Sequence, residues 1–276
     1  MYSHWTQTDI VVNGVKIHYT RTGHGDKRPI VLVHGFSDNG LCWTPVAREL
    51  EADYDVIMPD MRGHGLSERI RADEAVDMPA DVAELIGALG LDRPVVCGHS
   101  MGAGITYHIG VRFPELARAL VLEDPPFRES WPEQPADQAG ENPIVKWART
   151  LPGRNLDDLL VEYRREHPTW PEELVRPMCE AKKQLDPMVA ETMSARIRRD
   201  SSSWLDTLPQ IKLPMLVFTA NPELGAIVTP ESAAKALQLK PDINLVHISD
   251  VGHLIRFDSF ATFMQALRDF LKKIDY

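Results

Sequence analysis

The stretch PVVCGHSMG, residues 94–102, decides the fold. Its first four residues are an apolar run typical of a strand buried on both faces. A Gly-x-Ser-x-Gly sequence that follows such a strand and enters a helix makes a very sharp turn. The serine then takes a strained conformation, and the glycines leave room for neighbouring elements. Alone, the five residues are weak support for a nucleophile, because Gly/Ser clusters also form ordinary turns.

The same kind of apolar run recurs along the chain and predicts further buried strands. These are PIVLVHG (29–35), YDVIMPD (54–60), ARALVLED (117–124), PMLVFTA (214–220) and INLVHIS (243–249). Helix-like stretches separate most of them, and the last segment, SFATFMQALRDFLKKI, has helical periodicity. Residues 10–20 alternate around an Asn-Gly pair, which indicates a hairpin at one edge. We predict an α/β fold with a mostly parallel sheet covered by helices on both faces.

The alternation of strand and helix breaks between residues 125 and 208. We therefore predict a core domain of residues 1–124 and 209–276, with residues 125–208 inserted as a helical cap. The aromatic and methionine residues of this insertion suggest an apolar acyl or alcohol pocket, or else simply the insertion's own core. They are Trp131, Trp147, Trp170, Trp204, Phe127, Met178 and Met188.

Composition excludes several classes of protein. With 43% hydrophobic and 25% charged residues in 276, the chain is typical of a folded globular protein. A formal net charge of −10 argues against nucleic acid as a partner. The N-terminus lacks a signal-peptide pattern and the chain has no long apolar span, so we predict no membrane association and a cytoplasmic location. Three cysteines without a C-x-x-C pair, and no H-E-x-x-H, argue against disulfides and a metal.

A serine nucleophile needs a base within hydrogen-bond reach and a carboxylate that orients the base. In a serine hydrolase with this topology the chain order is serine, acid, histidine. His253 follows the last predicted strand, within DVGHLIRFD, and is the predicted base. His247 lies inside that strand, and His99 should leave the other side of the backbone from Ser100. Backbone N–H groups of Met101 and Phe36 are the predicted donors to the oxyanion.

Five segments, in this order, resemble the α/β-hydrolase family with a helical lid: HGFSDN, DMRGHGLS, GHSMGAG, LVLED and DVGHLIRFD. The resemblance covers essentially the whole chain. It implies an eight-stranded, mostly parallel sheet, a Ser-His-acid triad and no cofactor. It also implies a structural, loop-shaping role for DMRGHGLS.

The chain departs from the family at the triad acid. Members often carry an aspartate in the loop after the strand that corresponds to residues 214–220, but here the loop reads NPELGAIVTPE, with Asn221 and no aspartate. Three interpretations follow. The acid is Asp124, the position used by haloalkane-dehalogenase-like members; or it is Glu223 in the usual loop; or it is missing. We predict Asp124.

The sequence thus predicts a serine hydrolase that cleaves a small carboxylic ester with an apolar part, through Ser100, His253 and Asp124. Lactone hydrolysis, C–C bond hydrolysis and cofactor-free haloperoxidase or perhydrolase chemistry use the same triad and stay open. A ligand-binding member with little turnover is a further alternative. Epoxide hydrolases and dehalogenases of this fold attack with a carboxylate. Position 100 is a serine, so these two activities are excluded.

Overall fold

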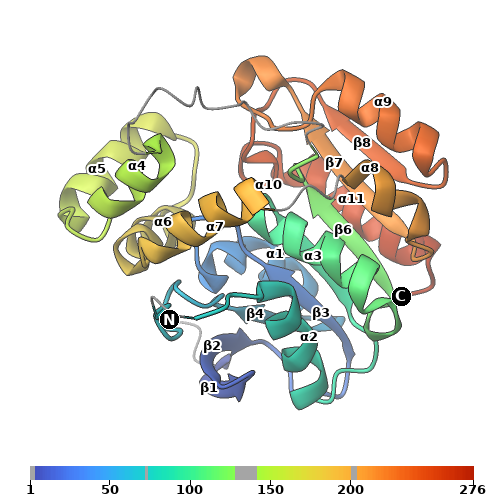
Figure 1. Ribbon diagram of the computed structural model, residues 1–276, viewed down its shortest axis with the longest axis horizontal. Helices are drawn as coiled ribbons and strands as arrows, with labels where there is room; N and C mark the ends of the chain where they lie inside the picture. The colour runs from blue at the N-terminus through green and yellow to red at the C-terminus, as the bar shows by residue number, and fades with distance from the viewer. Residues whose placement is uncertain (1–3, 72–73, 128–141, 200–203) are drawn as a thin grey trace.

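A computed structural model of the protein describes residues 4–71, 74–127, 142–199 and 204–276. Its eight strands form one sheet in the order β1-β2-β4-β3-β5-β6-β7-β8 (Figure 1). The strands β1 and β2, and β2 and β4, pair antiparallel, and all other neighbours pair parallel. The predicted mostly parallel sheet is therefore confirmed. The strands are β1 (Thr6–Val12), β2 (Val15–Arg21), β3 (Arg28–Val33), β4 (Tyr54–Pro59), β5 (Val95–His99), β6 (Ala119–Glu123), β7 (Met215–Ala220) and β8 (Asn244–Ile248).

Two hydrophobic cores lie on opposite faces of the sheet. In β3, Val31 and Val33 belong to one core and Ile30 and Leu32 to the other. Side chains alternate between the faces of a strand, so an unbroken run of apolar residues fills both cores at once. Helices α2 (Met78–Ala88), α3 (Met101–Arg112) and α9 (Pro230–Leu239) contribute to the first core, and α1 (Thr44–Leu50) and α11 (Phe260–Lys273) to the second.

The described part of the chain between β6 and β7 carries five α-helices, which we call the inserted helices. Figure 1 shows α4 to α7 together on one side of the sheet, with α8 near α9. They are α4 (Pro143–Thr150), α5 (Leu156–Glu166), α6 (Glu172–Gln184), α7 (Met188–Arg199) and α8 (Trp204–Thr207). The proposed domain boundaries at 124 and 209 stay a prediction.

The residues expected to line a pocket in the insertion differ in their burial and in the residues that they contact. Trp170 and Met178 are buried in a small core that the inserted helices share with Cys42. Phe127 and Trp204 are buried and stack, with ring centroids 4.6 Å apart. Trp147 is 44% exposed and its ring lies 5.9 Å from that of Phe36. Trp131 lies outside the described residues. Several of these side chains thus pack cores, and Trp147 lies beside Phe36, a predicted site residue.

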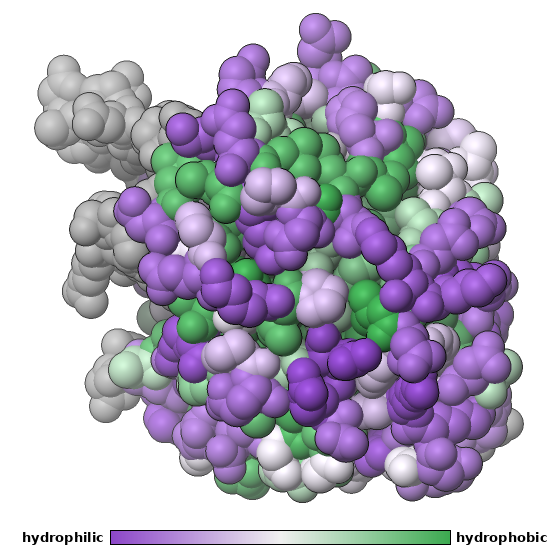
Figure 2. All heavy atoms as spheres, turned by 90° about the vertical axis from the view of Figure 1, so that its right-hand side faces the viewer, coloured by the Kyte–Doolittle hydropathy of each residue, from purple (hydrophilic) through white to green (hydrophobic). Residues whose placement is uncertain are grey.

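The side of the molecule on which α9 lies is largely polar. Figure 2 views the side on which α9 lies in Figure 1, and hydrophilic side chains cover most of it, with apolar ones between them. In the described ranges, no helix has the length and apolar character that a membrane span requires.

Candidate active site

Ser100 occupies the turn between β5 and α3. Its φ of 53° and ψ of −113° lie in a strained region for a residue with a side chain. A Cβ atom on Gly98 would collide with the Gly102 carbonyl oxygen, and one on Gly102 with the Val33 carbonyl oxygen. Both glycines are therefore required for α3 to pack this closely on the sheet. The Ser100 N–H donates to the Glu123 carbonyl, 2.9 Å away, which fixes the turn to the neighbouring strand.

Asp124 directly follows β6 as Ser100 directly follows β5, and the residues before them, Glu123 and His99, pair in the register of the sheet. Its side chain is fully buried and its φ is 42°. The carboxylate accepts hydrogen bonds from the N–H groups of Ile227 and Val228, at 2.8 and 3.0 Å, and faces Nδ1 of His253 at 2.5 Å. Both of its oxygens are thus satisfied, as a buried carboxylate requires.

His253 lies in the loop between β8 and α10 (Ile255–Asp258), with its side chain 30% exposed. Nδ1 faces a carboxylate, so the proton sits on Nδ1 and Nε2 is left as the acceptor. This is the tautomer that a general base needs. In the described chain no hydrogen bond joins His253 to the Ser100 hydroxyl; in hydrolases this contact often tightens only when substrate is bound.

The other two interpretations of the acid find less support in the geometry. Glu223 is exposed, and its backbone N–H donates to the Asn221 side chain at 2.9 Å. Asn221 thereby begins the short 3₁₀ helix Pro222–Leu224. The loop that carries the acid in many relatives supplies backbone donors to Asp124 here, through Ile227 and Val228.

His99 has a role that the sequence did not indicate. It is buried, and its Nε2 lies 3.0 Å from the His253 carbonyl oxygen, with the two rings 4.6 Å apart. Burial, assisted by Arg256, lowers its pKa well below the ordinary value, so the ring is neutral at pH 7. A carbonyl only accepts, so Nε2 carries the proton. The sequence predicts only that the His99 side chain points away from Ser100. It does not predict the contact between His99 and the His253 loop.

The two predicted oxyanion donors lie on adjacent turns. Met101 is the first residue of α3, where N–H groups have no partner within the helix. Phe36 follows β3, and in the described chain its N–H donates to no other residue. A Cβ on Gly35 would lie 2.6 Å from Nδ1 of His99, so this turn packs directly on the His99 ring.

Beneath these residues lies a cluster of buried charges. Arg256 donates to Glu123 from its backbone at 2.7 Å and from its guanidinium at 2.8 Å, and both side chains are fully buried. The guanidinium lies between the rings of Trp43 and Phe257, at 4.0 and 3.9 Å. Glu123 and Asp124 are consecutive and hold Arg256 and His253, so β6 fixes the whole His253 loop.

Two further charges belong to the same cluster. Asp38 and Lys182 are buried, and the Lys182 ammonium lies 3.2 Å from the carboxylate. Nη2 of Arg256 is 3.8 Å from the other oxygen of Asp38. The two carboxylates and two cations balance, which is the condition under which buried charges are tolerated. The described residues contain no cluster of three side chains fit to hold a metal ion.

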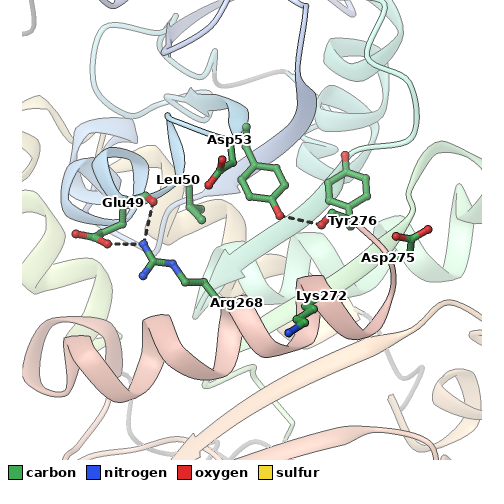
Figure 3. A pocket seen from close by; sticks show the side chains of 8 residues that line it. Glu49, Leu50, Asp53, Arg268, Lys272, Asp275 and Tyr276 are labelled. Atoms are coloured by element: carbon green, nitrogen blue, oxygen red, sulfur yellow. Dashed lines mark hydrogen bonds and ion pairs between the residues drawn. The ribbon is translucent and has the colours of Figure 1, made fainter.

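A polar hollow of about 250 Å³ lies at the edge of the sheet opposite Ser100. Figure 3 shows Arg268 of α11 reaching Glu49 of α1. The Tyr54 hydroxyl donates to the Tyr276 carbonyl at 2.9 Å, and the two rings stack. None of its lining residues belongs to the segments around Ser100, Asp124 and His253.

Comparison with known proteins adds the following. The model of a family described as "Alpha/beta hydrolase family" matches residues 30–266. The N-formylmaleamate deformylase of Pseudomonas putida is 28% identical over 275 residues, 95% of either chain. The 2-(acetamidomethylene)succinate hydrolase of Mesorhizobium japonicum is 26% identical and covers 97% of this chain and 96% of its own. A thermophilic esterase of Thermogutta terrifontis superimposes with a TM-score of 0.73 at 26% identity, over 98% and 99% of the two chains.

Proposed function

The chain belongs to the alpha/beta hydrolase family, and we propose that it is a serine hydrolase that cleaves a small carboxylic ester through an acyl-enzyme intermediate. One observation carries the proposal: the buried Asp124 carboxylate lies 2.5 Å from Nδ1 of His253, beside the strained turn of Ser100. Full-length relatives that are hydrolases support it.

Each residue has a distinct part in the proposed reaction. Ser100 attacks the acyl carbon while Nε2 of His253 takes the hydroxyl proton. The Phe36 and Met101 N–H groups stabilise the negative oxygen of the tetrahedral intermediate. His253 then gives its proton to the leaving alcohol, and water releases the acyl group by the same steps in reverse order. Asp124 holds the imidazole in the required tautomer and stabilises the imidazolium.

The inserted helices are proposed to act as a cap over this site, as part of the segment 125–208. Trp147 packs near the Phe36 ring while remaining 44% exposed, so it is placed to contact the apolar part of a substrate.

A second candidate is hydrolysis of a small N-acyl or N-formyl amide. It is favoured by two relatives that match over nearly the full length, a deformylase and a hydrolase of an acetamido compound. The same residues serve both reactions, because His253 protonates a leaving amine as it does a leaving alcohol. Lactones, C–C bonds and perhydrolysis stay further alternatives for the same site.

The test is turnover of short and medium-chain p-nitrophenyl esters and of N-formyl and N-acetyl anilides. Wild type is compared with Ser100→Ala and, for the acid, with Asp124→Asn. We expect turnover by wild type that Ser100→Ala abolishes, and the better of the two substrate sets identifies the bond cleaved. Equal rates for wild type and Ser100→Ala on every substrate would refute the hydrolase proposal.

A further inference from the structure

Lys182 makes an unusual contact between the inserted helices and the turn that carries Phe36. The ammonium of this α6 residue lies 3.2 Å from the Asp38 carboxylate and donates to the Ser37 carbonyl at 3.3 Å. The side chain is only 5% exposed, and lysine is almost never buried this deeply unless it is paired. Burial alone would lower the pKa of Lys182, but Asp38, together with Tyr163 and Cys42, outweighs burial and the pKa is raised, so the ammonium stays charged.

The turn of residues 35–38 is closed by a hydrogen bond from the Asp38 N–H to the Gly35 carbonyl, at 3.2 Å. Ser37 lies inside it with a φ of 65°, in the left-handed region that non-glycine residues rarely adopt. Such a conformation persists only where its surroundings hold it. Gly35 rests on the His99 ring, and Lys182 binds the other end of the turn. Together these contacts hold the peptide that presents the Phe36 N–H.

Asp38 shares one cation, Arg256, with Glu123 and depends on Lys182 for the charge that balances the cluster. Its other oxygen is 3.8 Å from Arg256 and 3.9 Å from His99, both too long for a hydrogen bond. In the described chain, Lys182 is therefore the sole hydrogen-bond donor to this carboxylate. Without the ammonium, a buried negative charge would remain next to the place where the oxyanion forms, and it would oppose that charge.

A second link joins the same two segments, while the neighbouring lysine makes none. Gln184, also on α6, accepts a hydrogen bond from Asn39 at 3.0 Å. Lys183 instead donates at 2.5 Å to the carbonyl of Arg154, which lies in the loop between α4 and α5. The contact with the turn is thus specific to one of two adjacent lysines.

We propose that Lys182 is a positioning residue for the oxyanion hole, so that the inserted helices complete the catalytic machinery as well as covering it. The inference rests on the proposed function, because it assigns Phe36 as an oxyanion donor.

The test measures kcat, KM and inhibition by an aryl trifluoromethyl ketone, which adds to a serine and forms an oxyanion. Misplacing a catalytic group by about 1 Å costs roughly 100-fold in rate, so Lys182→Met should lower kcat by about 10- to 100-fold, with KM changed less than about threefold. The ketone should bind more weakly by the same factor as kcat. Lys183→Met is the matched control and should change neither kcat nor the affinity for the ketone. Lys182→Arg keeps the charge and the donors, so its kcat should lie between those of Lys182→Met and wild type.

The double variant Lys182→Met with Asp38→Asn covers the case in which Lys182→Met does not fold, because it leaves no unpaired charge. It also lacks the bond to the Ser37 carbonyl, so its kcat should stay at least about tenfold below wild type. A folded Lys182→Met or double variant with wild-type kcat and ketone affinity would overturn the inference while leaving the proposed function intact. A wild type in which a fluorophosphonate fails to label Ser100 would overturn both.

Discussion

The two edges of the sheet are both polar, yet they differ in how their charges are held. At the amino edge, Arg268 and Glu49 pair across the hollow with side chains 51% and 45% exposed. At the carboxyl edge, Arg256 and Glu123 pair with both side chains fully buried. Positive φ does not separate the two edges, because it occurs at Ser100 and Asp124 and also at Asp275, which lines the hollow. The difference lies in burial, so a hollow with exposed charges is a weaker indication of function than buried, hydrogen-bonded charges.

The largest effect expected is on the orientation of His253. Asp124→Asn should lower kcat by about 10⁴, because an amide in this place favours the wrong imidazole tautomer. Kinetics on the best p-nitrophenyl ester measures it. Glu223→Gln is the matched control, since Glu223 is exposed and does not contact His253. A collapse in Glu223→Gln with Asp124→Asn unaffected would assign the acid to the other loop.

The buried pair should matter to stability far more than its exposed counterpart. Arg256→Met leaves the buried Glu123 carboxylate without a compensating cation, with the backbone N–H of residue 256 as its remaining donor, and should lower the free energy of unfolding by about 3–5 kcal/mol. Urea denaturation measures this value. Combining it with Glu123→Gln removes the unpaired charge and should restore most of the loss. A loss below about 1 kcal/mol in Arg256→Met would show that the cluster contributes little.

Buried histidines at the carboxyl edge should make stability depend on pH. Burial lowers the pKa of His34 to about 4 and of His64 to about 3, and that of His99 falls well below the ordinary value. The unfolded chain binds these protons near pH 6.5, so it holds more protons than the folded chain below that pH. The free energy of unfolding should therefore fall as the pH drops from about 6.5 towards 4.

His99→Gln measures the share of one histidine in this fall. Between pH 6 and 5 the variant should reduce the slope of the free energy of unfolding against pH. The reduction should be at most about 1.4 kcal/mol per pH unit, which corresponds to one proton. His24→Gln, at an exposed position, is the control and should leave the slope unchanged. If both variants keep the wild-type slope, His99 does not take up a proton on unfolding.

The smallest effect is expected at the amino edge. Arg268→Ala removes an exposed pair and should change the free energy of unfolding by less than about 1 kcal/mol. Its kcat should equal that of wild type, because the hollow is remote from Ser100. A tenfold fall in kcat would mean that the two edges are coupled.

Much of this molecule follows from local sequence patterns. Apolar runs located the parallel strands, and Gly98 and Gly102 marked the turn of Ser100, because only glycine fits so close to neighbouring backbone. Chain order predicts His253 as the base, and Asp124 is the predicted acid although the usual loop has Asn221. The 2.5 Å contact between Asp124 and His253 supports that preference; its catalytic role stays a prediction.

The supporting charges could not be predicted in this way. Lys182 and Asp38 are 144 residues apart, and Arg256 and Glu123 are 133 apart. No spacing distinguishes a buried lysine from the exposed charged residues around it, because its burial depends on how the inserted helices dock. For the same reason, sequence could not tell that Trp170 belongs to a core and Trp147 lies near Phe36.

The most direct test of the central claim, an activated Ser100, is labelling of the protein with a fluorophosphonate, read by intact mass. Wild type should gain one adduct that maps to Ser100, Ser100→Ala should gain none, and Asp124→Asn should react far more slowly. An unlabelled wild type, or an adduct that persists in Ser100→Ala, would contradict the account.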